Sequence, residues 1–310
     1  MRIKQVDTLK ALAILTVILI HGTKPETLAA SYSYLHISQP VPIFLVLMGF
    51  VAALSMKRNR AAYSVQYFTK KLQRYALPFI ALNIVVGLAQ RGFLVEGPGS
   101  YYISLIFQFV LVAPLIYMIY VRYPKATLIC TFLVTLAIDF ILPKILPFQL
   151  PANIIEFMPP IILGFWLADD WSFSRRNAFI VVGGILTAAF IIFSDQKTLM
   201  SKEFSHLMAL TIFYPTFLVM LGLKYLPSVK SLNLIGKASY HIFLVQVAYF
   251  AIAISRWDNR GGYEPVLSTV VNLAICVGLG LVFYYLDNLS RRAVNRNVNK
   301  LVLNSSARRG

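Results

Sequence analysis

The stretch DTLKALAILTVILIHGTK, from Asp7 to Lys24, decides the fold class and raises the first question about function. Its long apolar run is typical of a membrane-crossing helix, yet charged residues stand at its start and a histidine at its end. From Lys10 to Lys24 an α-helix rises about 21 Å, which is short of the roughly 30 Å hydrocarbon core of a bilayer. A wet vestibule that reaches down to His21 would account for so short a span.

Three polar side chains of this stretch share one helical face. At about 100° per residue, Lys10 and His21 lie within roughly 20° of each other, and Asp7 lies about 40° from His21. The rise from Lys10 to His21 is about 16 Å, around half of the bilayer core. Because an imidazole in lipid is costly, we expect His21 to face the bundle interior or an aqueous cavity. The alternative is a histidine that caps a short span at the interface.

The rest of the chain repeats this apolar pattern. Of its 310 residues, 58% are hydrophobic and only 13% are charged, which is too few charges to cover the surface of a soluble protein of this length. We therefore expect an all-α fold, a polytopic membrane helix bundle of about ten transmembrane helices. The expected spans are residues 8–23, 39–56, 75–91, 101–121, 126–144, 153–169, 178–194, 205–224, 241–256 and 265–286.

The net charge of +17 gives the orientation of the bundle. The basic residues lie in short clusters between apolar segments, which indicates anchoring at the inner leaflet and no nucleic-acid partner. With a cytoplasmic N-terminus and ten spans, roughly three quarters of the 29 Lys and Arg residues fall on inner segments, so both termini are expected in the cytoplasm. We expect one membrane domain over residues 1–310, with a basic cytoplasmic tail at 287–310 and no separate soluble domain.

The N-terminal apolar segment and the two cysteines each allow another interpretation. Basic residues before the apolar core and TLAA after it also fit a cleaved signal peptide, although Asp7 is unusual in such a peptide. Cys130 and Cys276 both lie in apolar stretches, where they suit membrane packing better than a disulfide. No Cys/His spacing typical of metal ligands is present, so no metal is expected.

A second basic segment, YFTKKLQRYALPF, lies where the chain re-enters the membrane. Lys71 and Arg74 are helical neighbours at i, i+3, and Lys70 and Arg74 at i, i+4. Cations that converge on one patch can bind phosphates. The alternative is an ordinary positive-inside anchor.

The first span resembles the opening of the membrane acyltransferase-3 family, which includes O-acetyltransferases of bacterial surface polysaccharides. In that family the span carries an Asp, a basic residue three positions later and a His eleven positions beyond, and Asp7, Lys10 and His21 match. VPIFLVLMGF is similar to its Phe-rich segment ending in Ser-Gly-Phe, with Met48 in place of the Ser.

Further segments resemble the same family in the same order. KKLQRYALPF is similar to its Arg-x-x-Arg motif followed by a proline, and YYISLIFQFVLVAPLIY to a Gln- and Pro-containing span. IGKASYHIFLVQ resembles its Gly-x-x-Ser-Tyr-x-x-Tyr-Leu-x-His segment, where Phe243 and Gln246 replace the usual Tyr and His. The residues that match that segment are Gly236, Ser239 and Tyr240.

The resemblance implies an integral membrane acyltransferase of the bacterial inner membrane. It would move an acyl group, acetyl in the first instance, from cytoplasmic acyl-CoA to a hydroxyl of an extracytoplasmic or lipid-linked polysaccharide. His21 would act as a general base or as the acyl acceptor, and either role requires a neutral imidazole. The residues implied to bind acyl-CoA are Lys10, Lys70, Lys71 and Arg74.

Other polar residues are supporting candidates. Asp7, on the face of His21, is one of them. Glu156 could orient His21 or bind a sugar, or be a plain interfacial carboxylate, and Asp139 is a candidate of similar weight. Ser239 and Tyr240 could pack at a helix start or belong to the cytoplasmic acyl-CoA site. Three further histidines are expected at the interface, at the ends of spans: His36, His206 and His241.

The rival hypothesis is a transporter, such as a polysaccharide exporter or flippase. Ten spans and a basic cytoplasmic face suit it equally well. A transporter would not require Lys10 and His21 on one face, however, and the sequence lacks the paired Gly- or Pro-broken helices of an inverted repeat.

Overall fold

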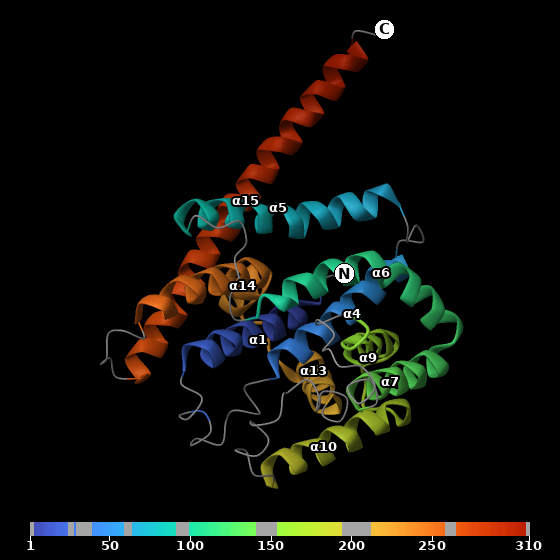
Figure 1. Cartoon of the computed structure of the whole chain (residues 1–310). Coiled ribbons are helices and arrows are strands. Elements are labelled where there is room, and N and C mark those ends of the chain that lie inside the picture. The colour runs from blue at the N-terminus through green and yellow to red at the C-terminus, as the bar shows by residue number, and fades with distance from the viewer. Residues whose placement is uncertain are drawn as a thin grey trace.

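The computed structural model describes residues 3–23, 28, 39–58, 64–90, 99–140, 154–193, 212–257 and 265–307. That part of the chain is all-helical and contains no strand (Figure 1), as expected for an all-α protein. The helices are α1 (Lys4–Gly22), α4 (Pro40–Arg58), α5 (Val65–Gln90), α6 (Tyr101–Arg122), α7 (Pro124–Phe140), α9 (Met158–Asp169), the 3₁₀ turn η1 (Arg175–Asn177), α10 (Ala178–Phe193), α13 (Phe213–Tyr225), α14 (Lys230–Trp257) and α15 (Pro265–Ala307).

Each expected span overlaps one α-helix, in the same order along the chain. Within the described residues, six helices are long and apolar enough to cross a membrane, and α7 and α9 are shorter apolar helices. The six candidate spans are Lys4–Gly22, Pro40–Arg58, Tyr101–Arg122, Arg175–Phe193, Lys230–Ile252 and Ser268–Ala293.

Several helices extend well beyond the boundaries expected from the sequence. Helix α14 begins at Lys230 instead of residue 241, α5 begins at Val65 instead of residue 75, and α15 continues to Ala307 where a tail was expected. Expected spans end at charged residues, but Lys and Arg are good helix formers, so a helix continues past the apolar segment into water. As a result the basic residues of α5 lie inside a helix.

Helix α1 lies at the centre of the bundle, where α4, α13, α14 and α15 pack against it (Figure 1). Polar contacts hold both of its ends. Near the start, the Thr8 hydroxyl donates to Asn233 Oδ1 at 3.0 Å, and at the end the Thr269 hydroxyl donates to the Gly22 carbonyl at 3.2 Å. The helix that carries Lys10 and His21 is therefore fixed against α14 and α15.

Glycines allow the closest helix crossings. A Cβ on Gly49 of α4 would collide with the carbonyl of Ile161, and one on Gly164 of α9 would collide with the carbonyl of Val46. Gly236 of α14 packs in the same way against the backbone of Asp7. Small residues let helix backbones approach closely in membrane bundles, so two glycines of the family-like motifs, Gly49 and Gly236, serve packing.

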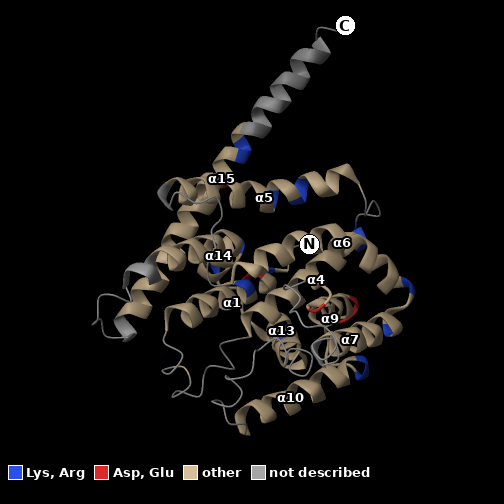
Figure 2. Cartoon of the chain, viewed as in Figure 1, with Lys and Arg blue, Asp and Glu red and all other residues tan. Residues whose placement is uncertain are grey.

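Charge is distributed unevenly over the bundle. The basic residues of the described part lie mainly near helix ends and along α5, while the middle stretches of most helices are uncharged (Figure 2). This separation is typical of a chain whose helices cross a bilayer.

Candidate active site

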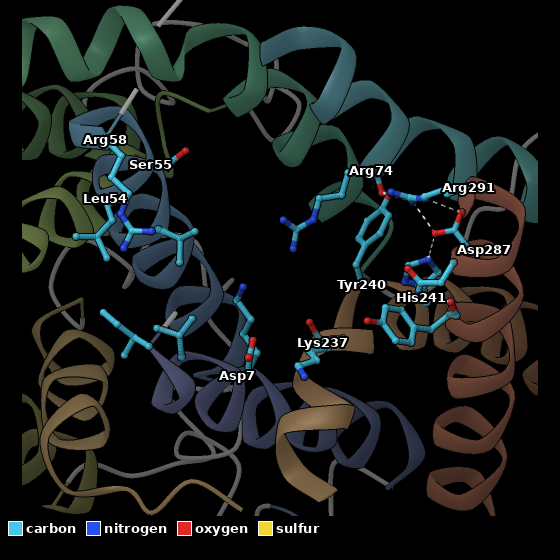
Figure 3. A pocket seen from close by; sticks show the side chains of 17 residues that line it. Asp7, Leu54, Ser55, Arg58, Arg74, Lys237, Tyr240, His241, Asp287 and Arg291 are labelled. Atoms are coloured by element: carbon cyan, nitrogen blue, oxygen red, sulfur yellow. Dashed lines mark hydrogen bonds and ion pairs between the residues drawn. The ribbon is translucent and has the colours of Figure 1, made fainter. Parts of the chain in front are cut away.

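A cavity of about 700 Å³ opens between α1, α4, α5, α14 and α15 (Figure 3). Five of its lining residues are basic and two are acidic. The basic residues are Lys10, Arg58, Arg74, Lys237 and Arg291, and the acidic residues are Asp7 and Asp287. Five separate elements thus direct cations into one space, which suits a ligand with several phosphates.

The cations surround the cavity instead of forming a single patch. Arg58 projects from α4 on one side, and Arg74 and Arg291 lie on the other, with Lys237 of α14 between them (Figure 3). A ligand in this space would contact cations from more than one direction. The size and charge of the cavity fit a nucleotide better than a single small anion.

Contacts with α14 and α15 hold Arg74 in place. The Tyr240 hydroxyl of α14 donates to the Tyr75 carbonyl at 2.8 Å, and the two rings meet edge to face at 5.2 Å. The Arg74 guanidinium lies 5.5 Å from the centre of the Tyr75 ring, within the range of a cation–π interaction. Arg291 of α15 also donates to the Arg74 carbonyl at 3.5 Å.

A partly buried ion-pair group forms one wall of the cavity. Asp287 of α15 accepts from His241 Nε2 at 2.8 Å and from Arg291 Nε at 3.0 Å (Figure 3). The candidate span that contains His241 runs from Lys230 to Ile252, so the expectation that His241 lies at a span end is wrong. The reason is that α14 starts eleven residues earlier, at Lys230, and His241 is a buried residue inside the helix.

A smaller cavity of about 90 Å³ adjoins the first and shares Lys10, Arg74, Ser239 and Tyr240 with it. Its other walls are mostly apolar and aromatic, and Lys71 lies at its basic end. Two of these aromatic side chains, Tyr102 and Phe243, meet edge to face at 5.3 Å. We call this small, mostly aromatic cavity the passage, and the large cavity beside it the basic chamber.

His21 lies close to this passage, near Gly99 and Phe243. A Cβ on Gly99 would be 3.5 Å from the Phe243 ring and 3.8 Å from His21 Nε2. On the other side, the Phe250 ring centre is 6.2 Å from that of the imidazole. Phe243 also lines the passage, so His21 is separated from a lining residue of the passage by Gly99. His21 itself lines neither cavity.

The structure brings together most of the residues singled out from the sequence. Lys10, Asp7, Arg74, Ser239 and Tyr240 line the large cavity, and Lys71 lines the passage. Two candidates line neither cavity: Lys70, which is exposed, and Glu156, which lies in the turn before α9. The side chain of Asp139 lies outside the described residues, and so do His36 and His206.

Four lining residues were not singled out from the sequence: Arg58, Lys237, Asp287 and Arg291. Asp287 and Arg291 are an i, i+4 pair, a spacing that could have indicated helix beyond the expected span end. Lys237 directly follows Gly236 of the family-like motif. Nothing in the sequence separates Arg58 from its neighbour Lys57.

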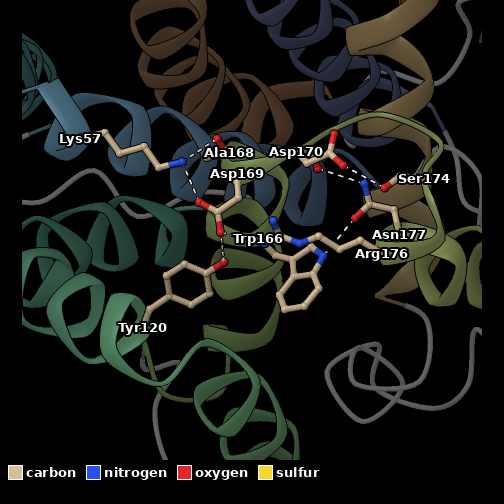
Figure 4. Close-up of polar contacts among 9 residues, drawn as sticks. All are labelled: Lys57, Tyr120, Trp166, Ala168, Asp169, Asp170, Ser174, Arg176 and Asn177. Atoms are coloured by element: carbon tan, nitrogen blue, oxygen red, sulfur yellow. Dashed lines mark hydrogen bonds and ion pairs between the residues drawn. The ribbon is translucent and has the colours of Figure 1, made fainter.

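Lys57 belongs to a different polar cluster, which joins α4, α6, α9 and η1 (Figure 4). Asp169 accepts from Lys57 at 2.6 Å, from Arg176 at 2.8 Å and from the Tyr120 hydroxyl at 2.8 Å. Arg176 also stacks over the Trp166 ring at 4.3 Å. Lys57 and Arg176 thus help to hold these helices together.

Next to that cluster, the partly exposed Asp170 carboxylate accepts hydrogen bonds from Ser172 and Ser174. These bonds favour the charged form and lower the pKa of Asp170. The carboxylate is a local turn contact and has no part in the cavity.

A third cavity, of about 440 Å³, lies between α1, α4 and α13. Its lining is almost entirely apolar and includes Thr16 and Gln39. Thr16 is about 140° from His21 around α1, so this cavity lies on the opposite face of the helix from the candidate site.

A family model described as an acyltransferase domain, that of the acyltransferase-3 family, matches residues 3–285. The chain therefore belongs to the acyltransferase-3 family and is a multi-pass membrane acyltransferase. No curated protein and no solved structure gives a significant match.

Proposed function

We propose that this protein transfers a short acyl group, with acetyl as the first candidate, from cytoplasmic acyl-CoA to a hydroxyl of an extracytoplasmic or lipid-linked polysaccharide. In this proposal the protein lies in a bacterial inner membrane, with ten spans and both termini in the cytoplasm. The observation that carries the proposal is a chamber with five cations, joined by an aromatic passage to the neighbourhood of His21.

The large cavity would bind the nucleotide of acyl-CoA. Its phosphates need several converging cations, and guanidinium groups match phosphate oxygens in pairs. Arg74 and Lys10 contribute to both the chamber and the passage, so they would hold the phosphates next to the point where the pantetheine arm enters. The arm is uncharged and extended, which suits a narrow aromatic passage.

His21 would carry the chemistry at the inner end of the arm. Its separation from Lys10 along α1, about 16 Å, is comparable with the length of an extended pantetheine chain. As a general base, the imidazole would take the proton of the sugar hydroxyl while that oxygen attacks the thioester carbon. As a nucleophile, it would accept the acyl group first and then pass it to the hydroxyl. Both routes need a neutral imidazole.

The test replaces His21 and follows transfer from acetyl-CoA labelled in its acetyl group. Membranes from a deletion strain of the parent organism, expressing each variant, should incorporate base-labile acetyl with the wild-type protein and none with His21→Ala. Because His21 does not line the basic chamber, the His21→Ala protein should bind CoA with the affinity of the wild type.

The matched control is Thr16→Ala on the same helix. The Thr16 hydroxyl donates only within its own helix among the contacts described, to carbonyls at Leu12 and Ala13, so its activity should stay near wild type. Full transfer by His21→Ala would disprove the proposed mechanism. If deletion of the gene stopped polymer export and left O-acyl content unchanged, the proposed substrate would be wrong.

A further inference from the structure

Gln246 of α14 is a buried carboxamide for which the described residues supply no hydrogen bond. Its side chain is 0% exposed, and neither Nε2 nor Oε1 has a hydrogen-bond partner within the described residues. Buried amides are nearly always hydrogen-bonded, because an unsatisfied donor or acceptor destabilises the fold. Packing alone would be better served by an apolar side chain, so the carboxamide indicates a hydrogen-bond partner other than the described residues.

The position of Gln246 on α14 indicates what that partner is. Ser239, Phe243, Gln246 and Phe250 follow one another at i, i+4, i+7 and i+11, which places all four within about 60° on one helical face. Ser239 lines the basic chamber and the passage, and Phe243 lines the passage. The Phe250 ring faces His21 at 6.2 Å. Gln246 therefore lies past the passage, about one turn from each of the two rings near His21.

The chemistry of the carboxamide suits the reacting end of a thioester. Its NH₂ group is a neutral donor that keeps its protons at any physiological pH. In acyl transfer, negative charge develops on the carbonyl oxygen, and a fixed donor in a dry site stabilises that charge. A neutral donor does so without placing a second titrating group near His21.

We infer that Gln246 is a catalytic residue that donates a hydrogen bond from Nε2 to the carbonyl oxygen of the acyl thioester beside His21. This inference rests on the proposed function and adds the group that stabilises the oxyanion. It requires a substrate whose reacting carbon reaches the level of Gln246, namely an acyl-CoA threaded through the passage.

On the general-base route, the acceptor hydroxyl oxygen bonds to the thioester carbon and His21 takes the hydroxyl proton. The carbonyl electron pair moves onto its oxygen, which Gln246 stabilises. When the pair returns, the carbon–sulfur bond breaks and the CoA sulfur takes the proton from His21. The products are an ester and CoA, and Gln246 neither gains nor loses a proton.

The experiment compares Gln246→Met with wild type in the labelled acetyl-CoA assay and in thermal unfolding of the detergent-solubilised full chain. Loss of one oxyanion donor should lower kcat about 100- to 1,000-fold, while the KM for acetyl-CoA changes by less than about threefold. Because an apolar side chain of similar shape removes buried unsatisfied groups, the Tm should stay the same or rise.

Two further variants keep the inference testable. Gln39→Met replaces the buried glutamine at the apolar third cavity and should leave kcat at the wild-type value. Gln246→His keeps an N–H donor and should retain more than about a tenth of wild-type kcat. This variant tests the inference even if Gln246→Met folds poorly.

A Gln246→Met protein with wild-type kcat, or equal losses of kcat in the Met and His variants, would overturn the inference. A fall in Tm that parallels the fall in activity would mean a structural role and would also overturn it. If His21→Ala is inactive and Gln246→Met is fully active, only this inference fails. If His21→Ala is itself active, the proposed function fails.

Discussion

At the scale of single residues, Arg74 and Lys10 are the cations for which we propose the most specific role, binding the phosphates of acyl-CoA where the pantetheine arm enters the passage. They come from different helices, α5 and α1, and both line the chamber and the passage. Removing a charged donor to a phosphate costs about 1.5–3 kcal/mol, so Arg74→Ala and Lys10→Ala should each raise the KM for acetyl-CoA about 10- to 100-fold. Initial rates with membranes of each variant measure this.

The control for these variants is Arg122→Ala. Arg122 is exposed at the end of α6 and donates to the neighbouring Tyr123 hydroxyl at 3.0 Å, so the KM should not change. An unchanged KM in Arg74→Ala and Lys10→Ala as well would mean that both residues are only positive-inside anchors.

At this scale the sequence predicts position along a helix face well and contacts between helices poorly. The small angle between Lys10 and His21 around the helix axis follows from helix geometry, and α1 is helical over both residues. Which basic residues face the cavity depends on how helices pack, and a single sequence does not reveal that. Lys57 and Arg58 are adjacent, yet one binds Asp169 and the other lines the chamber.

At the scale of elements, Asp169 joins four segments of the chain by accepting from Lys57, Arg176 and Tyr120. Tyr120 is only 2% exposed, so Asp169→Asn would weaken a buried hydrogen bond and remove the partner of two cations. The expected loss of unfolding free energy is about 1–2 kcal/mol, since the ion pairs themselves are partly exposed. Thermal unfolding in detergent should show a lower Tm.

The adjacent Asp170→Asn is the matched comparison, because Asp170 contacts only Ser172, Ser174 and the local turn among the interactions described. Its Tm should fall less than that of Asp169→Asn. Equal shifts would show that the cluster does not hold the helices together.

The existence and order of the helices could be predicted from apolar runs, while their ends could not. Apolar content marks only the part of a helix that suits lipid. The extra turns of α14 and α15 contain charged residues such as Lys237 and Arg291, and Asp287 ties the start of the extra turns of α15 to His241 of α14. The chamber wall on α15, with Asp287 and Arg291, comes from these extra turns, which explains why the sequence did not predict it.

At the scale of the whole molecule, we propose that the two ends of α1 serve different substrates, with acyl-CoA at the Lys10 end and the acceptor at the His21 end. The chamber with Lys10 would open to the cytoplasm, and His21 would be reached by the acceptor from the other side. In sealed vesicles, acetyl-CoA should therefore support transfer only when it is present on the cytoplasmic side. Labelled acetyl-CoA added to inside-out and right-side-out vesicles measures this directly, and detergent-opened vesicles give the total activity.

Transfer in right-side-out vesicles that matches the inside-out rate would contradict the proposed orientation. The same result would argue against cytoplasmic termini, since the orientation of the chamber and of the termini rests on the same distribution of basic residues. Vesicle sealing is checked by exclusion of a charged dye.

The most direct measurement of the central claim uses bromoacetyl-CoA, whose reactive carbon occupies the place of the acetyl methyl group. If the chamber binds the nucleotide and the passage leads the thioester to His21, the reagent should alkylate the His21 imidazole, as identified by mass spectrometry of the digested protein. Acetyl-CoA should protect His21, and Arg74→Ala should slow its labelling. Saturating reagent that leaves His21 unlabelled, or labels it equally fast in Arg74→Ala, would contradict the account.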